Sequence, residues 1–414
     1  MYDLRLVEGL CVRFSEQSAA AVAGGGSANL DSNGKRFAKG SIMMVHERED
    51  VKDYRNEVFL PFLNKIRPAI MQWDEDLCPI PNQQLLSGEQ QPIIIVTQDE
   101  CTFNANDGRH FIWTHEDHQP LRKKGRRQGL HVSDLVTPIG RLSEGAACEI
   151  LKCGGDIWWD GEKLLEQIKT KAIPLFEAEF PGCKALFLFD NAKTHCKYAD
   201  NALRVSKMNL VDGGKHAKQM RTTYVVDIQH PEGGYLQNMV QENGTPKGLK
   251  TVLTERGLWP ATEGRFLTQC SIKTRAGNTT PNSKCLQGGN CCVRALLASQ
   301  PDFKAQKGEL EEAIEEAGHM VLFYLAFHCE INFIEYFWGA AKRYTRQNCG
   351  YDFTSLQRLV PEALQQVTNT LIWKYHNKAQ WIIDAYESGE IYGSESYKKI
   401  VSKKYKSHRR SDAI

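Results

Sequence analysis

The sequence predicts an α/β protein in which a mixed β-sheet is flanked by helices. Two short apolar runs, at 93–96 and 185–189, are typical of strands buried on both faces. The segments Arg109–Trp113 and Leu130–Val136 predict two further strands between them, and Glu162–Phe180 has the apolar spacing of a helix. The predicted order is therefore strand, strand, strand, helix, strand, which belongs to the α/β class rather than to an all-helical or all-β class.

Composition excludes several classes of protein. The chain has 414 residues, of which 41% are hydrophobic and 25% charged, as expected for a globular chain with a real core. The net charge of +2 means that any nucleic-acid-binding surface must be local. We find no long apolar run and no secretory segment, so we expect no membrane partner and an intracellular chain whose 13 cysteines are reduced.

We expect a core domain interrupted by a long insertion. A strand at Met320–Phe327 and a helix at Asn332–Arg346 complete the core after a stretch rich in Gly, Asn, Thr and Lys. The expected parts are, in order, a linker-like or disordered N-terminus (1–40), a helical lead-in (41–91), the core (92–191 and 318–350) with its insertion (192–317), C-terminal helices (351–396) and a basic tail (397–414).

Prolines are expected to interrupt two of the predicted helices. The amphipathic stretch Glu47–Trp73 contains Pro61 and Pro68, and the helix at Glu162–Phe180 contains Pro174. Proline lacks a backbone N–H and its ring collides with the preceding turn, so each of these helices should bend or split near its proline.

Three carboxylates stand where such a sheet could bring them together. Asp99 and Asp190 follow the two apolar strands, and Glu335 lies in the first turns of the helix that follows the last strand. A single strand-end Asp is most often a turn or cap residue, and a single Glu near a helix start only complements the helix dipole. The combination is more informative, because the three side chains converge at one sheet edge if the first and fourth strands are neighbours.

Converging carboxylates repel one another unless a cation neutralises them. Oxygen-only ligands suit Mg²⁺ or Mn²⁺, and two such ions can activate a nucleophile and stabilise a leaving oxygen in phosphoryl transfer. The sequence thus predicts a two-ion site held by Asp99, Asp190 and Glu335.

Two basic segments are candidates for DNA contact. A solvated surface is the simpler interpretation of each, although the density of positive charge also fits a phosphate backbone. The candidate DNA-binding residues are Arg122, Lys123, Lys124, Arg126 and Arg127 in a predicted loop, and Lys403, Lys404, Lys406, Arg409 and Arg410 in the tail, where Tyr397 and Tyr405 are interleaved.

The cysteines permit one further interpretation. Cys291 and Cys292, with Cys270, Cys285, His195 and His328, could be assembled into a zinc site. Their spacing matches no standard zinc module, so ordinary buried thiols are the simpler interpretation.

On these residues the sequence resembles a mariner-like Asp–Asp–Glu (DDE) superfamily transposase or endonuclease, of the type common in fungi. The resemblance extends over roughly residues 39 to 410. Its main motifs are Val96-Thr-Gln-Asp-Glu100, Phe189-Asp-Asn-Ala-Lys-Thr-His195 and His328-Cys-Glu-Ile-Asn-Phe-Ile-Glu-Tyr-Phe-Trp338. Supporting motifs are Lys39-Gly40 with His46-Glu-Arg-Glu-Asp-Val51, Gln119-Pro-Leu-Arg122, Val132-Ser-Asp134, Pro246-Lys-Gly-Leu249 and Lys404-Tyr-Lys-Ser-His-Arg409.

The resemblance implies an RNase H-like, retroviral-integrase-type fold in which the catalytic Asp99, Asp190 and Glu335 bind the two ions. It also implies that Asn191, His195 and Asn332 orient the ligands or the substrate. Two departures are expected to matter. Glu335 follows Asp190 by 335 − 190 = 145 residues, which places the insertion before the last catalytic helix. Residues 1–38 are Gly/Ala-rich and are expected to lack the N-terminal helix-turn-helix module of the family.

Three functions remain open at this point. The first is a metal-dependent DDE transposase or endonuclease that cleaves and transfers strands of double-stranded DNA in the nucleus, as a homodimer. The second is a catalytically inert or truncated, transposase-derived protein that binds DNA without cutting it. The third is a zinc-organised interaction domain in the insertion.

Overall fold

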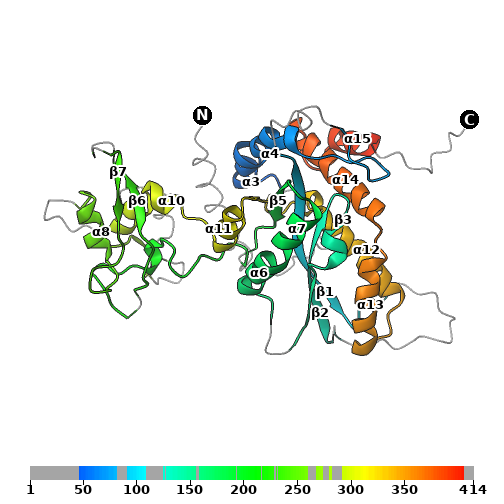
Figure 1. Cartoon of the computed structure of the whole chain (residues 1–414), viewed down its shortest axis with the longest axis horizontal. Coiled ribbons are helices and arrows are strands. Elements are labelled where there is room, and N and C mark those ends of the chain that lie inside the picture. Colours follow the sequence, from blue (N-terminus) through cyan, green and yellow to red (C-terminus); the bar gives the residue numbers. More distant parts are fainter. Residues whose placement is uncertain are drawn as a thin grey trace, which may run out of the picture. The chain divides into compact units, whose positions relative to one another are not determined.

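The computed structural model describes residues 46–81, 91–108, 125, 127–154, 158–192, 194–215, 217–227, 230, 232–259, 267–273, 279–281 and 291–404. These residues divide into two compact units. Residues 197–309 form the smaller unit, and the described residues before and after this stretch form the larger one (Figure 1). The strand predicted at Arg109–Trp113 lies outside the described residues. Among the helices of the described ranges, none has the length and apolar character needed to cross a bilayer.

The larger unit is built on one six-stranded sheet. Across the sheet the strands run β10-β5-β1-β2, and β3 and β4 both pair with β2. β1, β5 and β10 are parallel, whereas β2 is antiparallel to β1. This order and these directions are those of the RNase H-like fold, so the predicted fold class is confirmed. The strands are β1 (Ile93–Asn104), β2 (Gly129–Thr137), β3 (Gly140–Arg141), β4 (Glu149–Lys152), β5 (Lys184–Phe189) and β10 (Met320–Phe323).

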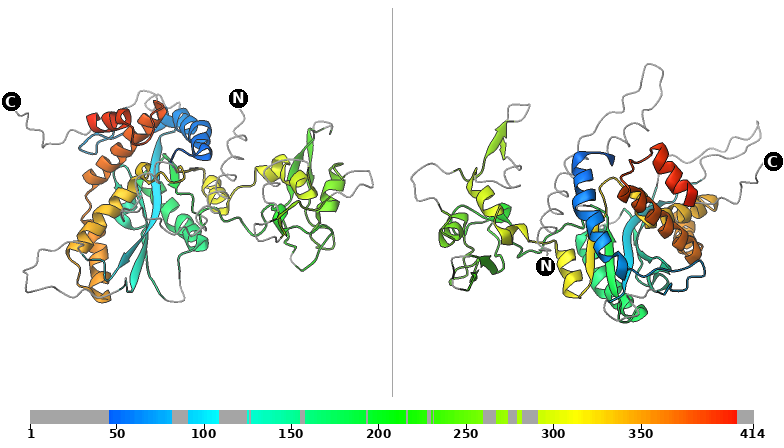
Figure 2. Two further views of the ribbon diagram at one scale, coloured as in Figure 1. Left: turned by 180° about the vertical axis from the view of Figure 1, so that it is seen from behind. Right: turned by 90° about the horizontal axis from the view of Figure 1, so that it is seen from above.

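Helices cover both faces of this sheet, as Figures 1 and 2 show. Successive residues of a strand point to opposite faces. Thr97 of β1 donates a hydrogen bond to Asn332 beside α12, and the next residue, Gln98, reaches Gln167 of α6 through Ser133. The helices of the larger unit are α3 (Glu49–Tyr54), α4 (Leu60–Ile66), α6 (Gly161–Gln167), α7 (Ile173–Glu179), α11 (Glu309–Glu316), α12 (Phe333–Gln347), α13 (Phe353–Gln365), α14 (Asn369–Glu387) and α15 (Glu395–Lys404).

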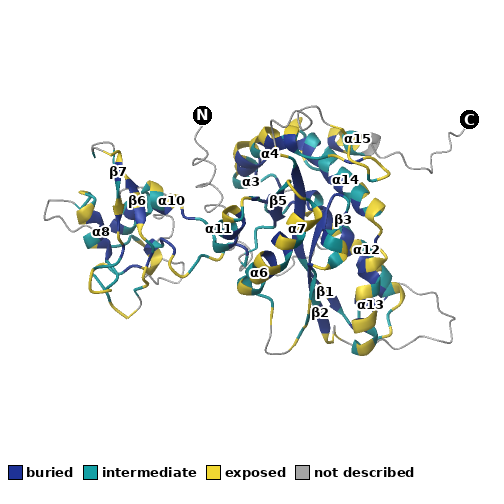
Figure 3. Cartoon of the chain, in the orientation of Figure 1, coloured by how far each residue is buried: buried dark blue, intermediate teal, exposed yellow. Residues whose placement is uncertain are grey.

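The central strands owe their position to their apolar sequence. Ile94 and Val96 of β1, with Phe187 and Phe189 of β5, are fully buried in a core shared with the α6–α7 segment. Figure 3 shows the same pattern, with buried strands inside and exposed residues on the outer faces of the helices. Burying each large apolar side chain contributes roughly 1.5–3 kcal/mol. The sheet is therefore the rigid part of this unit.

The predicted helix interruptions are confirmed and take a specific form. A π-helical turn, η1 (Arg55–Phe59), precedes Pro61, and a second one, η4 (Ile168–Ala172), precedes Pro174. A wider turn accommodates the proline ring and the missing N–H while the helix continues as α4 or α7. The first helix then ends in a short 3₁₀ turn, η2 (Arg67–Ala69), which contains Pro68.

Several boundaries differ from those expected. β1 continues to Asn104, so Asp99 lies within this strand rather than at its end. The last core strand is shorter than Met320–Phe327, because β10 ends at Phe323 and Phe327 has a φ of 68° that no strand accommodates. The chain then turns through η7 (Cys329–Ile331) into α12.

The boundary expected at residue 397 falls inside α15. Tyr397 is only 7% exposed, and its ring packs against Tyr386 of α14 and against Tyr392. The first turns of the predicted basic tail are therefore part of the packed fold. Residues 405–414, with Tyr405, lie outside the described residues.

The smaller unit has its own hydrophobic core. Leu249, Val252 and Leu253 of α8 pack with Val293 and Leu297 of α9. An ion pair between Arg256 and Asp302, with atoms 2.7 Å apart, is also almost completely buried. Its elements are η5 (Val205–Lys207), β6 (Thr223–Val226), β7 (Gly234–Gln237), α8 (Leu249–Glu255), β8 (Ser271–Lys273), β9 (Thr279–Pro281), α9 (Val293–Ala298) and α10 (Pro301–Lys304).

Candidate active site

The sheet register places Asp99 beside Asp190. Thr97 of β1 pairs with Leu188 of β5 in parallel, so the residues two positions further on, Asp99 and Asp190, are level with each other. β5 ends at Phe189, and Asp190 lies just past this end. Neighbouring first and fourth strands were the condition for convergence of the carboxylates, and this pairing fulfils it.

Glu335 lies on α12, the third of the three elements that carry the carboxylates. It is an exposed residue in the first turn of α12, whose start is fixed by Asn332. Asn332 is buried and its Oδ1 accepts a hydrogen bond from Thr97 Oγ1 at 2.9 Å. Thr97 lies two residues before Asp99 on the same face of β1, so this bond ties the start of α12 to the strand that carries Asp99.

Electrostatics indicate that the three carboxylates form one cluster. Asp99 is 8% exposed, and burial followed by the charges of Glu335 and Asp190 raises its pKa well above the usual value. Although Glu335 as a whole is exposed, partial removal of water from around its carboxylate raises the pKa of Glu335, with Lys342 opposing the rise and Asp190 adding to it. Asp99 and Glu335 thus experience negative charge that is not fully compensated, which is the environment that a bound cation relieves.

His195 compensates part of this negative charge through its contacts with Asp190 and Glu100. Its side chain is fully buried; Nδ1 lies 2.8 Å from Asp190 Oδ1, and Nε2 lies 3.4 Å from Glu100 Oε1. Burial alone would lower the pKa of His195, but the hydrogen bonds and charges of these two carboxylates raise it to about 10. A protonated His195 donates from both ring nitrogens and holds Asp190 ionised, with the pKa of Asp190 lowered despite its burial.

Asn191 connects the end of β5 to the segment after β10. Its Nδ2 donates a hydrogen bond to the backbone carbonyl of Tyr324, just past β10. The hydroxyl of Tyr324 in turn donates to Thr97 Oγ1 at 3.1 Å. Asn191, Tyr324, Thr97 and Asn332 therefore form a chain of hydrogen bonds beneath the cluster, and this chain connects β5, β10, β1 and α12.

A buried polar network holds the segment between β10 and α12, which contains His328 and Glu330. His328 Nδ1 lies 2.6 Å from Glu330 Oε1, and the hydroxyl of Tyr386 donates to the same oxygen at 2.5 Å. The ring of His328 also packs on that of His46, with centroids 4.5 Å apart. Burial would raise the pKa of Glu330, but the bonds from His328 and Tyr386 lower it. This network joins the first described residue of the chain to η7 and α14.

Sequence reasoning missed three residues of the site. Glu100 accepts from Trp159 Nε1 at 2.7 Å and from Gln98 Nε2 at 2.9 Å, in addition to its contact with His195. Its position directly after Asp99, on the opposite face of the strand, was the available signal. Lys342 follows Glu335 by two helical turns, a spacing that keeps both on one face of α12. Tyr324 gave no signal, because it lay within a run predicted to be an apolar strand.

Most predicted DNA-binding residues cannot be placed. Arg122, Lys123, Lys124 and Arg126 lie outside the described residues, as do Lys406, Arg409 and Arg410. Arg127 is exposed just before β2. The backbone of Lys403 and Lys404 belongs to α15.

Two groups of potential metal ligands among the described residues have all their ligand atoms within 4.8 Å of one another, and the three carboxylates are not one of them. One consists of His46, His328 and Glu330, the polar network above. The other consists of Cys270, Cys291 and Cys292 in the smaller unit. Of the residues grouped for zinc in the sequence, Cys285 lies outside the described residues, whereas His195 and His328 belong to the larger unit.

Comparison with known proteins gives similar solved structures but no sequence match. The "Mos1 transposase paired-end complex with left transposon end" is 10% identical at a TM-score of 0.35, covering 95% of this chain and 86% of that chain. The Mos1 mariner paired-end complexes with Mn and with Mg are each 11% identical at a TM-score of 0.36, covering 95% and 96% of this chain and 87% of theirs. No protein family and no curated protein matches the sequence. The fold assignment therefore rests on strand order and pairing.

Proposed function

We propose that the larger unit is the catalytic core of a DDE-type transposase or endonuclease, which cleaves and transfers DNA strands with the help of divalent metal ions. The observation that carries the proposal is the register of β1 and β5, which aligns Asp99 with Asp190 in an RNase H-like sheet while α12 supplies Glu335. Burial and the neighbouring carboxylates raise the pKa of Asp99 and of Glu335, which supports a site shared by the three side chains.

The residues fit a divalent cation. Asp99, Asp190 and Glu335 offer only oxygen ligands. Burial raises the pKa of Asp99, and the repulsion from Glu335 and Asp190 that adds to this rise is the kind that Mg²⁺ or Mn²⁺ removes. Two ions at such a site would activate a water or a 3′-hydroxyl and stabilise the leaving oxygen of an in-line displacement at phosphorus.

Each remaining polar residue has a positioning task in this proposal. His195 keeps Asp190 ionised and fixes the direction of its carboxylate through the 2.8 Å contact. Thr97 holds Asn332, and thereby the first turn of α12, against β1. Lys342 lies on the face of α12 that carries Glu335, where its positive charge can meet a phosphate of the substrate backbone.

The substrate in this proposal is double-stranded DNA. Strand transfer joins two DNA ends, so we propose a homodimer as the active form and the nucleus as its location. The basic loop 122–127 and the residues after α15 are the proposed contacts to the phosphate backbone.

The test is a plasmid-nicking assay of the full chain in Mg²⁺ and in Mn²⁺. Glu335→Gln keeps the size of the side chain and removes its charge, whereas Glu166→Gln makes the same change at an exposed position of α6. We expect nicking by the wild type and by Glu166→Gln, and a loss of at least about a thousandfold in Glu335→Gln, as for other groups that stabilise transition-state charge. Equal nicking by all three proteins would refute the assignment. Salt-sensitive DNA binding without nicking by any of them would instead favour an inert DNA-binding protein.

A further inference from the structure

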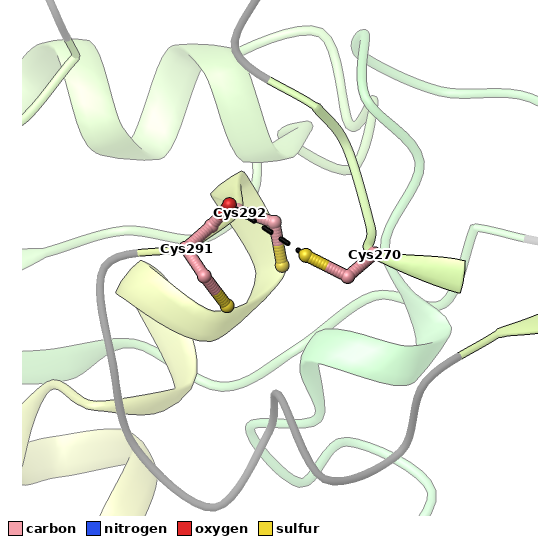
Figure 4. A group of neighbouring side chains, drawn as sticks. All are labelled: Cys270, Cys291 and Cys292. Carbon is pink, nitrogen blue, oxygen red and sulfur yellow. Dashed lines mark hydrogen bonds between the residues drawn. The ribbon is translucent and has the colours of Figure 1, made fainter. Parts of the chain in front are cut away.

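The smaller unit contains a cluster of three cysteines that the proposed catalytic reaction does not use. Cys270 lies directly before β8, whereas Cys291 and Cys292 lie directly before α9. Their sulfur atoms are within 4.8 Å of one another. Figure 4 shows the sulfurs of Cys270 and Cys292 facing each other, with Cys291 beside them.

Backbone hydrogen bonds hold the two segments of the cluster in place. Val293 N donates to Leu267 O at 2.9 Å, and Arg294 N donates to Thr268 O at 3.1 Å. The thiol of Cys270 also contacts the carbonyl oxygen of Cys291 at 3.6 Å. The three sulfurs are thus brought together by the fold of the unit itself, and a ligand would meet a preformed site.

Cys292 is the most deeply buried of the three cysteines, whereas Cys270 is partly exposed and Cys291 is exposed. A ligand can therefore reach the cluster from the side of Cys291. Metal binds the thiolate form of cysteine, so binding would release the thiol protons.

We infer that Cys270, Cys291 and Cys292 bind one soft metal cation, principally Zn²⁺, with water as the fourth ligand of the tetrahedron, and that this metal stabilises the unit. Zinc–sulfur bonds of about 2.3 Å in a tetrahedron separate the sulfurs by roughly 3.8 Å, which small movements of the three side chains can reach from their present spacing. Thiolate ligands select Zn²⁺ or Cu⁺ over the hard ions that suit the carboxylate cluster.

The site would stabilise a weak part of the fold. β8 and β9 contribute three residues each to an isolated two-stranded sheet, and such a hairpin is marginal in water by itself. A metal bound by Cys270 on one side and by Cys291 and Cys292 on the other would fasten this hairpin to the start of α9. The core of α8 and α9 packs without the cluster, so the metal adds to a unit that already has a core.

The experiment is a measurement of metal content in the full chain, purified under reducing conditions and dialysed after loading with zinc. We expect about one Zn²⁺ per chain in the wild type, as for a structural thiolate site. Cys292→Ser should lose it. Cys153→Ser, which alters a partly exposed cysteine of the larger unit, should keep it. Glu335→Gln should also keep it, so the result does not depend on whether the carboxylate cluster is catalytic.

Two further measurements distinguish loss of the metal site from misfolding of the variants and from oxidation of the cysteines. Cobalt titration of the wild type should give thiolate-to-metal charge-transfer absorption that Cys270→Ser and Cys291→Ser weaken, even where the folded fraction, measured by circular dichroism, is unchanged. Zinc content in the wild type no higher than in Cys292→Ser would overturn the inference. A Cys270–Cys292 disulfide in freshly purified protein, found by alkylation and mass spectrometry, would also overturn it.

Discussion

Replacing Asp99 by Asn should make the metal-free protein more stable and abolish its activity. Asp99 is buried, and its ionised form is opposed by burial, by Glu335 and by Asp190. Asn has nearly the same shape but no charge, so it removes the repulsion and keeps the packing. A residue whose only role is structural would behave in the opposite way, since its loss would lower stability.

The magnitude follows from the charges around Asp99. Two like charges about 6 Å apart repel by about 3 kcal/mol at an effective dielectric constant of about 20. His195 beside Asp190 and Lys342 near Glu335 offset part of this repulsion. We therefore expect Asp99→Asn to stabilise the metal-free unit by about 1–2 kcal/mol, which raises the melting temperature by roughly 3–6 °C for a domain of this size.

The assay is thermal unfolding in EDTA and again in Mn²⁺, alongside plasmid nicking. Mn²⁺ at about ten times its dissociation constant should stabilise the wild type by about 1.4 kcal/mol and should have little effect on Asp99→Asn.

Asp134→Asn is the matched control. Asp134 lies opposite Asp99 in the β1–β2 register and is paired with Arg141 at 2.7 Å. The Asp134→Asn variant should be less stable by up to about 3–5 kcal/mol, because the Arg141 guanidinium, whose side chain is only 12% exposed, loses its charged partner. A lower melting temperature for Asp99→Asn in EDTA, with an undiminished response to Mn²⁺, would refute the reasoning.

Two other changes test the support of α12 and the proposed DNA surface. Glu330→Gln should destabilise the protein at neutral pH by about 1–3 kcal/mol in urea unfolding. Because the pKa of Glu330 is lowered in the folded protein, its contribution to stability is fully present above the unfolded pKa of about 4.3 and is lost as the pH falls through the folded pKa. The difference in stability between wild type and Glu330→Gln should therefore shrink in acid. A difference that grows in acid would contradict this explanation. Removing 405–414 deletes Lys406, Arg409 and Arg410 but keeps Tyr397 in its packed position. It should reduce the salt slope of DNA binding by up to about three, at about 0.9 per phosphate contact, without changing the melting temperature; an unchanged slope would exclude these residues from the DNA surface.

The sequence was most informative where residues are buried on both sides. The apolar runs of β1 and β5 can only be buried on both faces, so the sequence predicted both strands and the positions of Asp99 and Asp190 in or just after them. β4 was missed because it is a short edge strand whose residues alternate between exposed and partly buried. The end of β10 was misplaced because hydrophobicity continues to Phe327, whereas the backbone already turns toward Asn332.

The contacts between distant segments could not be predicted. Nothing in the spacing of Cys270 and Cys291 indicates that a backbone ladder brings them together. Likewise, Glu100 gave only a weak signal, because its role depends on His195 reaching it from beyond β5. Such contacts arise from the fold as a whole, and a single sequence records them only as isolated polar residues.

The support of α12 has a consequence for synthesis of the protein on the ribosome. His46 begins the described fold, yet its ring packs on His328, and Glu330 is held by His328 and by Tyr386 of α14. A growing chain has both aspartates after residue 190 but obtains the third carboxylate only at residue 335, and α14, which steadies it, only at residue 387. Nascent chains shorter than this would thus carry an incomplete carboxylate cluster, so the proposed cutting of DNA would have to wait until α14 has been made and has folded.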